Sequence, residues 1–275
     1  MLRAHCFPKI GPTLVAGMML SMIFGRIAMA DENTEPELDP MKRSYPEVYD
    51  TPTGAPPEWQ RLKMGSQIHT FFQADRFEYQ LNDDDNKRVW DAQGWIGGDY
   101  NKFWLKTEGE GVPGEAWESA EIQALYSRTI SSFWDVQVGV RHDFRPDPDR
   151  TFGVFGVQGL APYWFEVDTA VFAGERGDVR WRGEFEYELL LTQKLILQPR
   201  LEVNASFDDV PEHGVGSGLN ETELGVRLRY EIRREIAPYI GISWAKKYGD
   251  TADFAETEGE STSTVSFVMG LRAWF

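Results

Sequence analysis

The chain has 275 residues and carries 44 Asp and Glu against 28 Lys and Arg. This length allows one large domain or two small ones, and the acidic balance argues against nucleic acid as a partner. The one cysteine, Cys6, lies in an N-terminal segment that we expect to be removed, so the mature protein would hold no disulfide, thiolate metal site or cysteine nucleophile. A mean hydropathy of −0.43 argues against a bundle of apolar helices, but it suits a β-barrel, because only alternate residues of a barrel strand face lipid.

Residues 1–30 have the features of a secretory signal peptide. Arg3 and Lys9 precede a short apolar run over 14–24, and an A-x-A cleavage site ends at Ala30. The apolar run is too short to cross a bilayer comfortably. We therefore expect export and cleavage after Ala30. The removed segment has basic but no acidic residues, so the mature chain is still more acidic and attracts cations, although such a charge also serves solubility alone.

The next segment, 31–62, is rich in Pro, Glu, Asp and Thr and has few apolar residues. Such a composition cannot bury enough apolar surface to fold, so we expect a disordered, acidic periplasmic tail. The sequence pattern changes after this segment. Aromatic and β-branched residues alternate with charged residues, and clusters of turn residues interrupt the alternation at regular intervals. We therefore assign 63–275 to a single all-β domain.

The alternation within this domain is clearest over 180–189, 195–207 and 221–232, where apolar residues occupy one face and charged residues the other. A period of two over so many residues predicts β-strands. The twelve predicted strands cover 67–80, 88–98, 103–110, 116–128, 134–143, 151–160, 164–173, 179–190, 195–207, 220–232, 237–249 and 262–275.

The charged faces carry both signs of charge, and the period alone leaves two architectures open. A soluble sandwich would turn its apolar faces into a shared core, whereas a membrane barrel turns them to lipid and encloses the charges. Three features favour the barrel: the last strand ends on Phe275, aromatics gather near strand ends, and tight connections alternate with longer acidic ones. We expect a transmembrane antiparallel β-barrel in the lipid of the outer membrane of a Gram-negative cell, with both ends of the barrel chain on the periplasmic side.

Several long strings identify a resemblance. DAQGWIGGDYNKFWLKTEGE over 91–110, VGVRHDF over 138–144, FGVQGLAPYWFEV over 155–167 and ELGVRLRYEIRREIAPYIG over 223–241 resemble the copper resistance protein B family. The resemblance extends over about 60–275, in order and without large gaps. It implies an outer-membrane barrel in a copper resistance system, which binds copper or passes it across the membrane and is not an enzyme. A periplasmic copper-resistance protein would be a natural partner.

The chain departs from the family's pattern in one respect. Members often carry a long stretch rich in Met and His before the barrel, and here the tail has only Met41, with Met64 just before the barrel, and no His. Soft thioether clusters suit Cu(I). A copper-storing tail is therefore not expected, and the oxidation state of the copper stays open.

The candidate metal ligands are Met64 and the three histidines of the mature chain. Met64 and His69 lie close in sequence at the predicted periplasmic mouth, near carboxylates such as Asp75. Imidazole is a natural ligand for copper, and thioether sulfur suits its reduced form. These residues could form an entry site; the alternative is an ordinary strand start with a hydrogen-bonded histidine.

His142 and His213 lie at the other predicted end of the barrel. The parity of its strand turns His142 toward lipid with Val138 and Val140, so it is either a metal ligand at the rim or an interfacial residue without that role. His213 follows the acidic loop 208–212, which could bind a divalent cation weakly or could simply be solvated.

Many charged residues take inward parity, so the predicted lumen is itself a candidate site. A lumen this charged is either a path for cations or a closed network of ion pairs. Small barrels fill their interiors with side chains, and buried charges must be paired, so we favour a narrow or plugged lumen. The inward residues are Glu166, Asp168, Arg180, Arg182, Glu184, Glu186, Glu188, Arg200, Glu202, Glu223, Arg227, Arg229 and Glu231.

Two other functions stay open at this point. An outer-membrane barrel hydrolase of the lipase or protease type would need a nucleophile and base on strand ends, and His142 has Asp143 beside it but no His-x-Ser string or G-x-S-x-G elbow. A purely structural barrel would owe its metal association to other proteins of its operon. Copper handling is the function that the resemblance favours.

Overall fold

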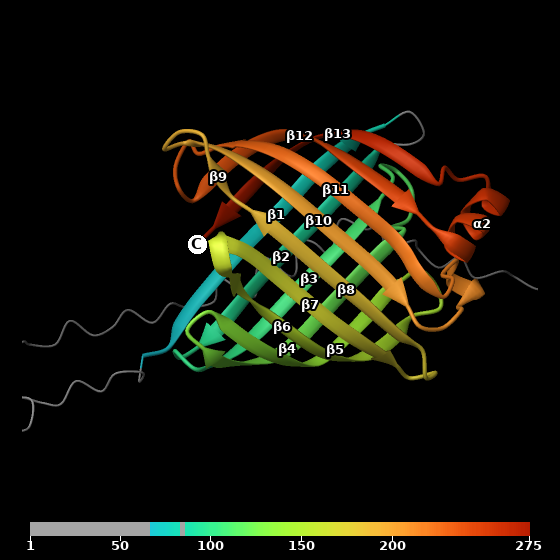
Figure 1. Ribbon diagram of the computed structural model, residues 1–275, viewed down its shortest axis with the longest axis horizontal. Coiled ribbons are helices and arrows are strands. Elements are labelled where there is room, and N and C mark those ends of the chain that lie inside the picture. The colour runs from blue at the N-terminus through green and yellow to red at the C-terminus, as the bar shows by residue number, and fades with distance from the viewer. Residues whose placement is uncertain (1–66, 83–85) are drawn as a thin grey trace, which may run out of the picture. The chain divides into compact units, whose positions relative to one another are not determined.

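The computed structural model describes residues 67–82 and 86–275. The expected signal peptide, the expected acidic tail over 31–62 and Met64 lie outside these ranges. The described residues belong to one compact unit, Lys63–Phe275, and form a tilted barrel of antiparallel strands (Figure 1).

The strands of the described ranges form one sheet. β9 is separated from β8 by Glu188 alone and pairs with the same neighbour, β10, so the two make one interrupted strand. The wall therefore has twelve strand positions, which confirms the predicted count. The strands are β1 (His69–Leu81), β2 (Lys87–Gly97), β3 (Asn101–Gly111), β4 (Ser119–Ser131), β5 (Trp134–Arg145), β6 (Arg150–Ala161), β7 (Phe165–Gly174), β8 (Val179–Tyr187), β9 (Leu189–Leu190), β10 (Leu195–Ser206), β11 (Gly218–Tyr230), β12 (Ile236–Lys247) and β13 (Ser263–Trp274).

The sheet closes on itself, because β1 pairs with β13 and β10 pairs with β11. The last residue completes the seam: Phe72 N donates to Phe275 O at 3.0 Å, and Phe275 N donates to Phe72 O at 2.8 Å. Closure leaves no unpaired strand edge along the wall. Since the number of strand positions is even, β1 begins and β13 ends at the same mouth, which we call the C-terminal mouth (Figure 1).

The opposite mouth carries a helix that the sequence analysis did not predict. The region 250–261 was expected to be a loop, and the structure instead forms α2 (Gly249–Glu258). Its buried residues Thr251 and Ala255 are four apart and so share one face. Gly259 ends the helix in the left-handed conformation, at φ +83°. We call this end of the barrel the α2 mouth. Within the described residues, α2 and the other helical segments are all too short or too polar to cross a bilayer.

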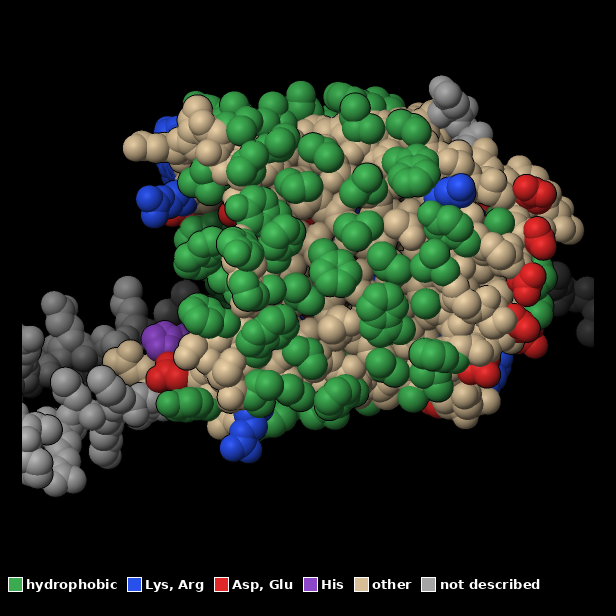
Figure 2. Space-filling model, viewed as in Figure 1, with side chains coloured by type: hydrophobic (Ala, Val, Ile, Leu, Met, Phe, Trp, Pro, Cys, Tyr) green, Lys and Arg blue, Asp and Glu red, His purple; other side chains and the backbone are tan. Residues whose placement is uncertain are grey.

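The two faces of the wall differ in polarity, which decides between the two architectures left open above. On β5, Val140 is 54% exposed on the outside, whereas the inward Gln137 is 2% exposed. Apolar side chains cover the flank of the barrel, and charged side chains gather at its ends (Figure 2). A soluble sandwich would bury the apolar face instead. The chain is therefore a transmembrane β-barrel of the inverted kind, apolar outside and polar within.

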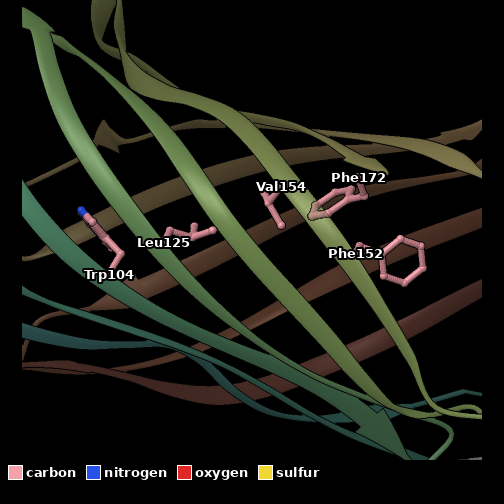
Figure 3. Packing of buried hydrophobic residues seen from close by; sticks show 5 residues of the cluster. All are labelled: Trp104, Leu125, Phe152, Val154 and Phe172. Carbon is pink, nitrogen blue, oxygen red and sulfur yellow. The ribbon is translucent and has the colours of Figure 1, made fainter. Parts of the chain in front are cut away.

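The interior also holds a small apolar cluster, which strict alternation of charge did not predict. Its members lie on the inner faces of β3, β4, β6 and β7 (Figure 3). Guanidinium groups cover it: Arg141 Cζ lies 4.7 Å from the centre of the Phe172 ring, and Arg180 Cζ lies 5.2 Å from that of Phe152. Stacking on an aromatic face stabilises arginine in a confined space. The cluster comprises Trp104, Leu125, Phe152, Val154 and Phe172.

Candidate functional site

The inside of the barrel contains two cavities, one toward each mouth. The first, of about 460 Å³, is lined at the C-terminal mouth by residues such as Gln73 and Asp75. The second, of about 720 Å³, is lined at the α2 mouth by residues such as Lys87 and Glu110 and by the segment 259–262. Both are bordered by charged side chains, so the lumen is the largest concentration of polar chemistry in the described part of the chain.

A chain of alternating carboxylates and guanidinium groups crosses the lumen between the cavities. Arg76 Nη2 lies 2.6 Å from Glu108 Oε1, and Arg182 Nη1 lies 2.8 Å from the other oxygen of the same carboxylate. Arg182 Nη2 also lies 3.2 Å from Glu121 Oε2, and Arg141 Nη2 lies 2.6 Å from that atom. Charge-assisted hydrogen bonds of this kind are short and strong, so the centre of the lumen is bridged by side chains.

Other ion pairs join residues on neighbouring or nearby strands of the barrel wall. Arg200 lies within 3.2 Å of Glu184, Glu186 and Glu202, which sit on its own strand and on β8. Arg227 Nε donates to Glu78 Oε2 at 2.8 Å, and the Glu78 side chain is 0% exposed. A buried charge without a partner costs several kcal/mol, roughly 3–5 when one partner of a pair is removed. The pairing therefore allows so many charges to be enclosed.

An irregularity in β1 brings two consecutive charges into the lumen. The register with β2 shifts between Ala74 and Arg76, so Asp75 is an extra residue, a β-bulge. Asp75 lines the first cavity and Arg76 lines the second. After the bulge, Glu78 points inward and Phe77 is exposed on the outer face.

The lumen residues expected from parity lie as follows. Glu166, Asp168, Glu184 and Glu186 line the first cavity, Arg180, Glu202 and Glu223 line the second, and Arg182 lines both. Arg200 and Arg227 make the wall pairs described above, while Glu188 Oε1 lies 2.7 Å from Arg229 Nη2 and 2.8 Å from Arg272 Nη1. Glu231 differs from the expectation: β11 ends at Tyr230, so Glu231 belongs to the turn that leads to β12.

Sequence reasoning missed other charges of the lumen, because it applied parity chiefly to the later strands. The alternation that could have found most of them is present, since Glu121 and Gln123 oppose Ile122 and Ala124 on β4. The additional charges in ion pairs include Arg76, Glu78, Asp91, Lys106, Glu108, Glu121, Arg150, Asp178 and Arg272.

The three candidate histidines do not come together in the described part of the chain. His69 is the exposed first residue of β1, at the C-terminal mouth. His142 lies on the outer face of β5, where its Nδ1 is 3.0 Å from Thr151 Oγ1 and its ring meets the Phe144 ring edge-on. Across residues 67–82 and 86–275, no three His, Asp or Glu side chains are arranged to hold a metal ion.

His213 lies in a short helical turn, η3 (Pro211–His213), between β10 and β11. Burial lowers the pKa of His213 below its usual value, and the positive charges of Arg150 and Arg180 lower it further. A neutral imidazole is the form that binds metals. The loop carboxylates are engaged elsewhere, however: Asp208 accepts a hydrogen bond from Val179 N, Asp209 accepts one from Ser217 N, and Glu212 pairs with Arg176.

A closed wall that is apolar outside and encloses a network of ion pairs defines a transmembrane β-barrel with an ionic lumen. The model of the family "Copper resistance protein B precursor (CopB)" matches residues 68–275. The chain belongs to this copper resistance protein B family.

Two relatives match this chain over the same share of its length. Copper resistance protein B of Escherichia coli is 48% identical over 210 residues, which are 76% of this chain and 71% of that protein. The copper resistance protein B homolog of Pseudomonas syringae pv. tomato (strain ATCC BAA-871 / DC3000) is 44% identical over the same shares. Among solved structures, the NanC porin covers 74% of this chain and 99% of its own, with 14% identity and a TM-score of 0.47.

Proposed function

We propose that this protein is a non-enzymatic barrel of the outer membrane that binds copper ions or passes them across that membrane as part of a copper resistance system. The observation that carries the proposal is the 48% identity to copper resistance protein B, which extends over the whole barrel. Copper is here the cargo of the lumen, and the proposal does not depend on its oxidation state.

The surface supports the membrane part of the proposal. The outer face of the wall exposes large apolar side chains on every side, among them Phe103, Val138, Phe155 and Ile242. Exposing so much apolar surface to water would be unfavourable by about 25 cal/mol for each Å². A closed barrel satisfies its backbone hydrogen bonds within its own wall, as a lipid environment requires.

The lumen supports the copper part. Carboxylates border both cavities, and those of Asp75, Glu166 and Glu186 line the first one. Carboxylates outnumber the cationic groups that line this cavity, and an excess of one sign of charge raises the local concentration of counter-ions. Carboxylate oxygens attract Cu²⁺, while His69 at the C-terminal mouth and Met64, five residues before it in the sequence, would offer softer donors.

The hydrolase alternative rested on His142, and the structure gives it no support. The ring of His142 lies on the apolar outer face beside Phe144, and its polar neighbours are Thr151 and Asp149. A histidine that serves as a general base must reach a nucleophile in a site that substrate can enter.

Titration of the purified, detergent-solubilised barrel with Cu²⁺, and with Cu⁺ under reducing conditions, tests the proposal. We expect binding of at least one form to be tighter than that of Zn²⁺ under the same conditions. In parallel, copper tolerance is measured in a Gram-negative host with and without the chain. A protein that binds neither form of copper and leaves tolerance unchanged would refute the proposal and favour a structural role.

A further inference from the structure

The two cavities of the lumen meet at three side chains. Glu108, Glu121 and Arg182 are the charged residues that border both cavities. Any ion that moves from one cavity to the other must therefore pass these three groups. Their contacts decide whether the lumen is one passage or two separate chambers.

Arg182 makes these contacts from the opposite wall. It lies on β8, whereas Glu108 is on β3 and Glu121 on β4, the fifth and fourth strands away around the ring. Its Nη1 lies 2.8 Å from Glu108 Oε2, and its Nη2 lies 3.2 Å from Glu121 Oε2. The guanidinium group thus spans the lumen and occupies the boundary between the cavities.

The side chain of Arg182 is also held by residues of the two strands that flank β8. Its Cζ lies 5.8 Å from the centre of the Phe172 ring on β7, and its Nε donates to Asn204 Oδ1 on β10 at 3.3 Å. Phe172 belongs to the buried interior cluster, so the ring on which the Arg182 guanidinium stacks is held in place by packing. A planar guanidinium that stacks on a ring and holds two carboxylates is well ordered.

The two carboxylates do not depend on Arg182 for neutralisation. Glu108 and Glu121 are register partners on β3 and β4. Glu108 is also held by Arg76 at 2.6 Å, and Glu121 by Arg141 at 2.6 Å. Withdrawal of Arg182 would therefore leave each carboxylate with a cationic partner, and it would remove a positive charge from the path.

Lys106 and Asp168 form a second pair that spans the lumen, from β3 to β7. Both residues line only the first cavity. This pair narrows one chamber, whereas Arg182 separates the two.

We propose that Arg182 is the gate residue of this barrel: its contacts with Glu108 and Glu121 close the lumen between the cavities, and its withdrawal joins them into a passage that selects small cations. This inference deepens the proposed function. It rests on that function in one respect, namely that ions cross the lumen. The two carboxylates left in the passage give it its preference for cations over anions.

Conductance of the full chain in planar lipid bilayers, in potassium chloride without copper, tests the gate. We expect the wild-type barrel to conduct little and Arg182→Ala to conduct several-fold more, with a reversal potential in a salt gradient that shows a preference for K⁺ over Cl⁻. Arg128→Ala is the matched control. It removes the same charge from an exposed side chain of β4 that lines neither cavity, and it should behave like the wild type.

Arg182→Lys provides a second variant that keeps the charge. A single ammonium group cannot hold both carboxylates as the guanidinium fork does, so openings should be more frequent than in the wild type. Folding of every variant is checked by heat-dependent migration on gels. Wild-type conductance in folded Arg182→Ala and Arg182→Lys barrels, or an equal increase in Arg128→Ala, would overturn the gate. A barrel that opens in Arg182→Ala, while the wild type neither binds copper nor changes copper tolerance, would sustain the gate and refute the copper proposal.

Discussion

Arg182 Nη1 lies 2.8 Å from Glu108 Oε2, although β8 and β3 stand five strands apart around the barrel. The same carboxylate accepts from Arg76 on β1, so one glutamate connects three separate parts of the wall. Bridges of this kind hold opposite walls at a set distance. Ion pairs thereby bridge the lumen between its two cavities.

Removing one partner of the buried pair of Glu78 and Arg227 should destabilise the barrel strongly. Arg227→Met leaves the Glu78 carboxylate, at 0% exposure, without its closest cation, and we expect a loss of about 3–5 kcal/mol in the free energy of unfolding. The double variant Glu78→Gln with Arg227→Met removes both charges and should recover most of this loss. Denaturant unfolding in detergent micelles, followed by tryptophan fluorescence, measures both. Equal losses in the single and double variants would contradict the pairing.

A new charge should cost more stability on the outer face of the wall than on the face that lines the lumen. Val140→Lys places an ammonium group on the apolar outer face near the middle of β5, and we expect a cost of about 2–4 kcal/mol to stability in lipid. Gln93→Lys is the control, because Gln93 lines the first cavity and lies 2.8 Å from an oxygen of Asp75. Folding into vesicles under a urea gradient compares them. A similar cost for both would mean that the face assignment is wrong.

Removal of Phe275 should weaken closure of the barrel. Deletion removes the two backbone hydrogen bonds with Phe72 and the terminal ring. Phe275→Ala keeps the hydrogen bonds and loses only the ring. We expect the deletion to lower the amount of folded protein in the outer membrane more than the substitution does, as measured by heat-dependent migration on gels. If the two variants assemble equally well, the seam contributes nothing beyond the ring.

Met64 and His69 are the first residues to test as copper ligands. Replacing both by Ala should weaken copper binding, since it removes a thioether and an imidazole, the latter at the C-terminal mouth. His142→Ala is the comparison, because that ring lies on the outer face and is engaged with Thr151. Calorimetric titration measures all three proteins. Unchanged affinity and unchanged copper tolerance in the double variant would discard Met64 and His69 as ligands.

The α2 mouth should loosen in acid. The hydrogen bond from Lys247 holds the pKa of Glu260 below its usual value of 4.5. The folded form therefore favours the ionised carboxylate, so its stabilising contribution is complete above pH 4.5 and is lost as the pH falls through the lowered pKa. In the wild type, hydrogen exchange in α2 should accelerate as the pH falls from 4.5 through the lowered pKa of Glu260. Glu260→Gln should lack this step, and an identical pH profile in the variant would argue against the pair.

The sequence by itself determined the wall of this protein. Alternation over segments such as 195–207 and 221–232 predicted the strands, and the alternation of short and long connections favoured a membrane barrel. Both signals are local: neighbours in an antiparallel barrel are consecutive in the chain, and side chains alternate with a period of two. The family was also recognisable, because its strings extend through the whole barrel.

Only the tertiary structure decided what lies inside. The bulge at Asp75 reverses the parity of β1, and no local pattern in the sequence indicates the extra residue, so parity alone could not have placed both Asp75 and Arg76 in the lumen. The contact of Arg182 with Glu108 joins residues 74 positions apart on opposite walls. Period two shows which side chains turn inward, but curvature, tilt and register decide which of them meet across the lumen. The ionic core is thus a property of the closed barrel, since its partners become neighbours only when the sheet joins its own edge.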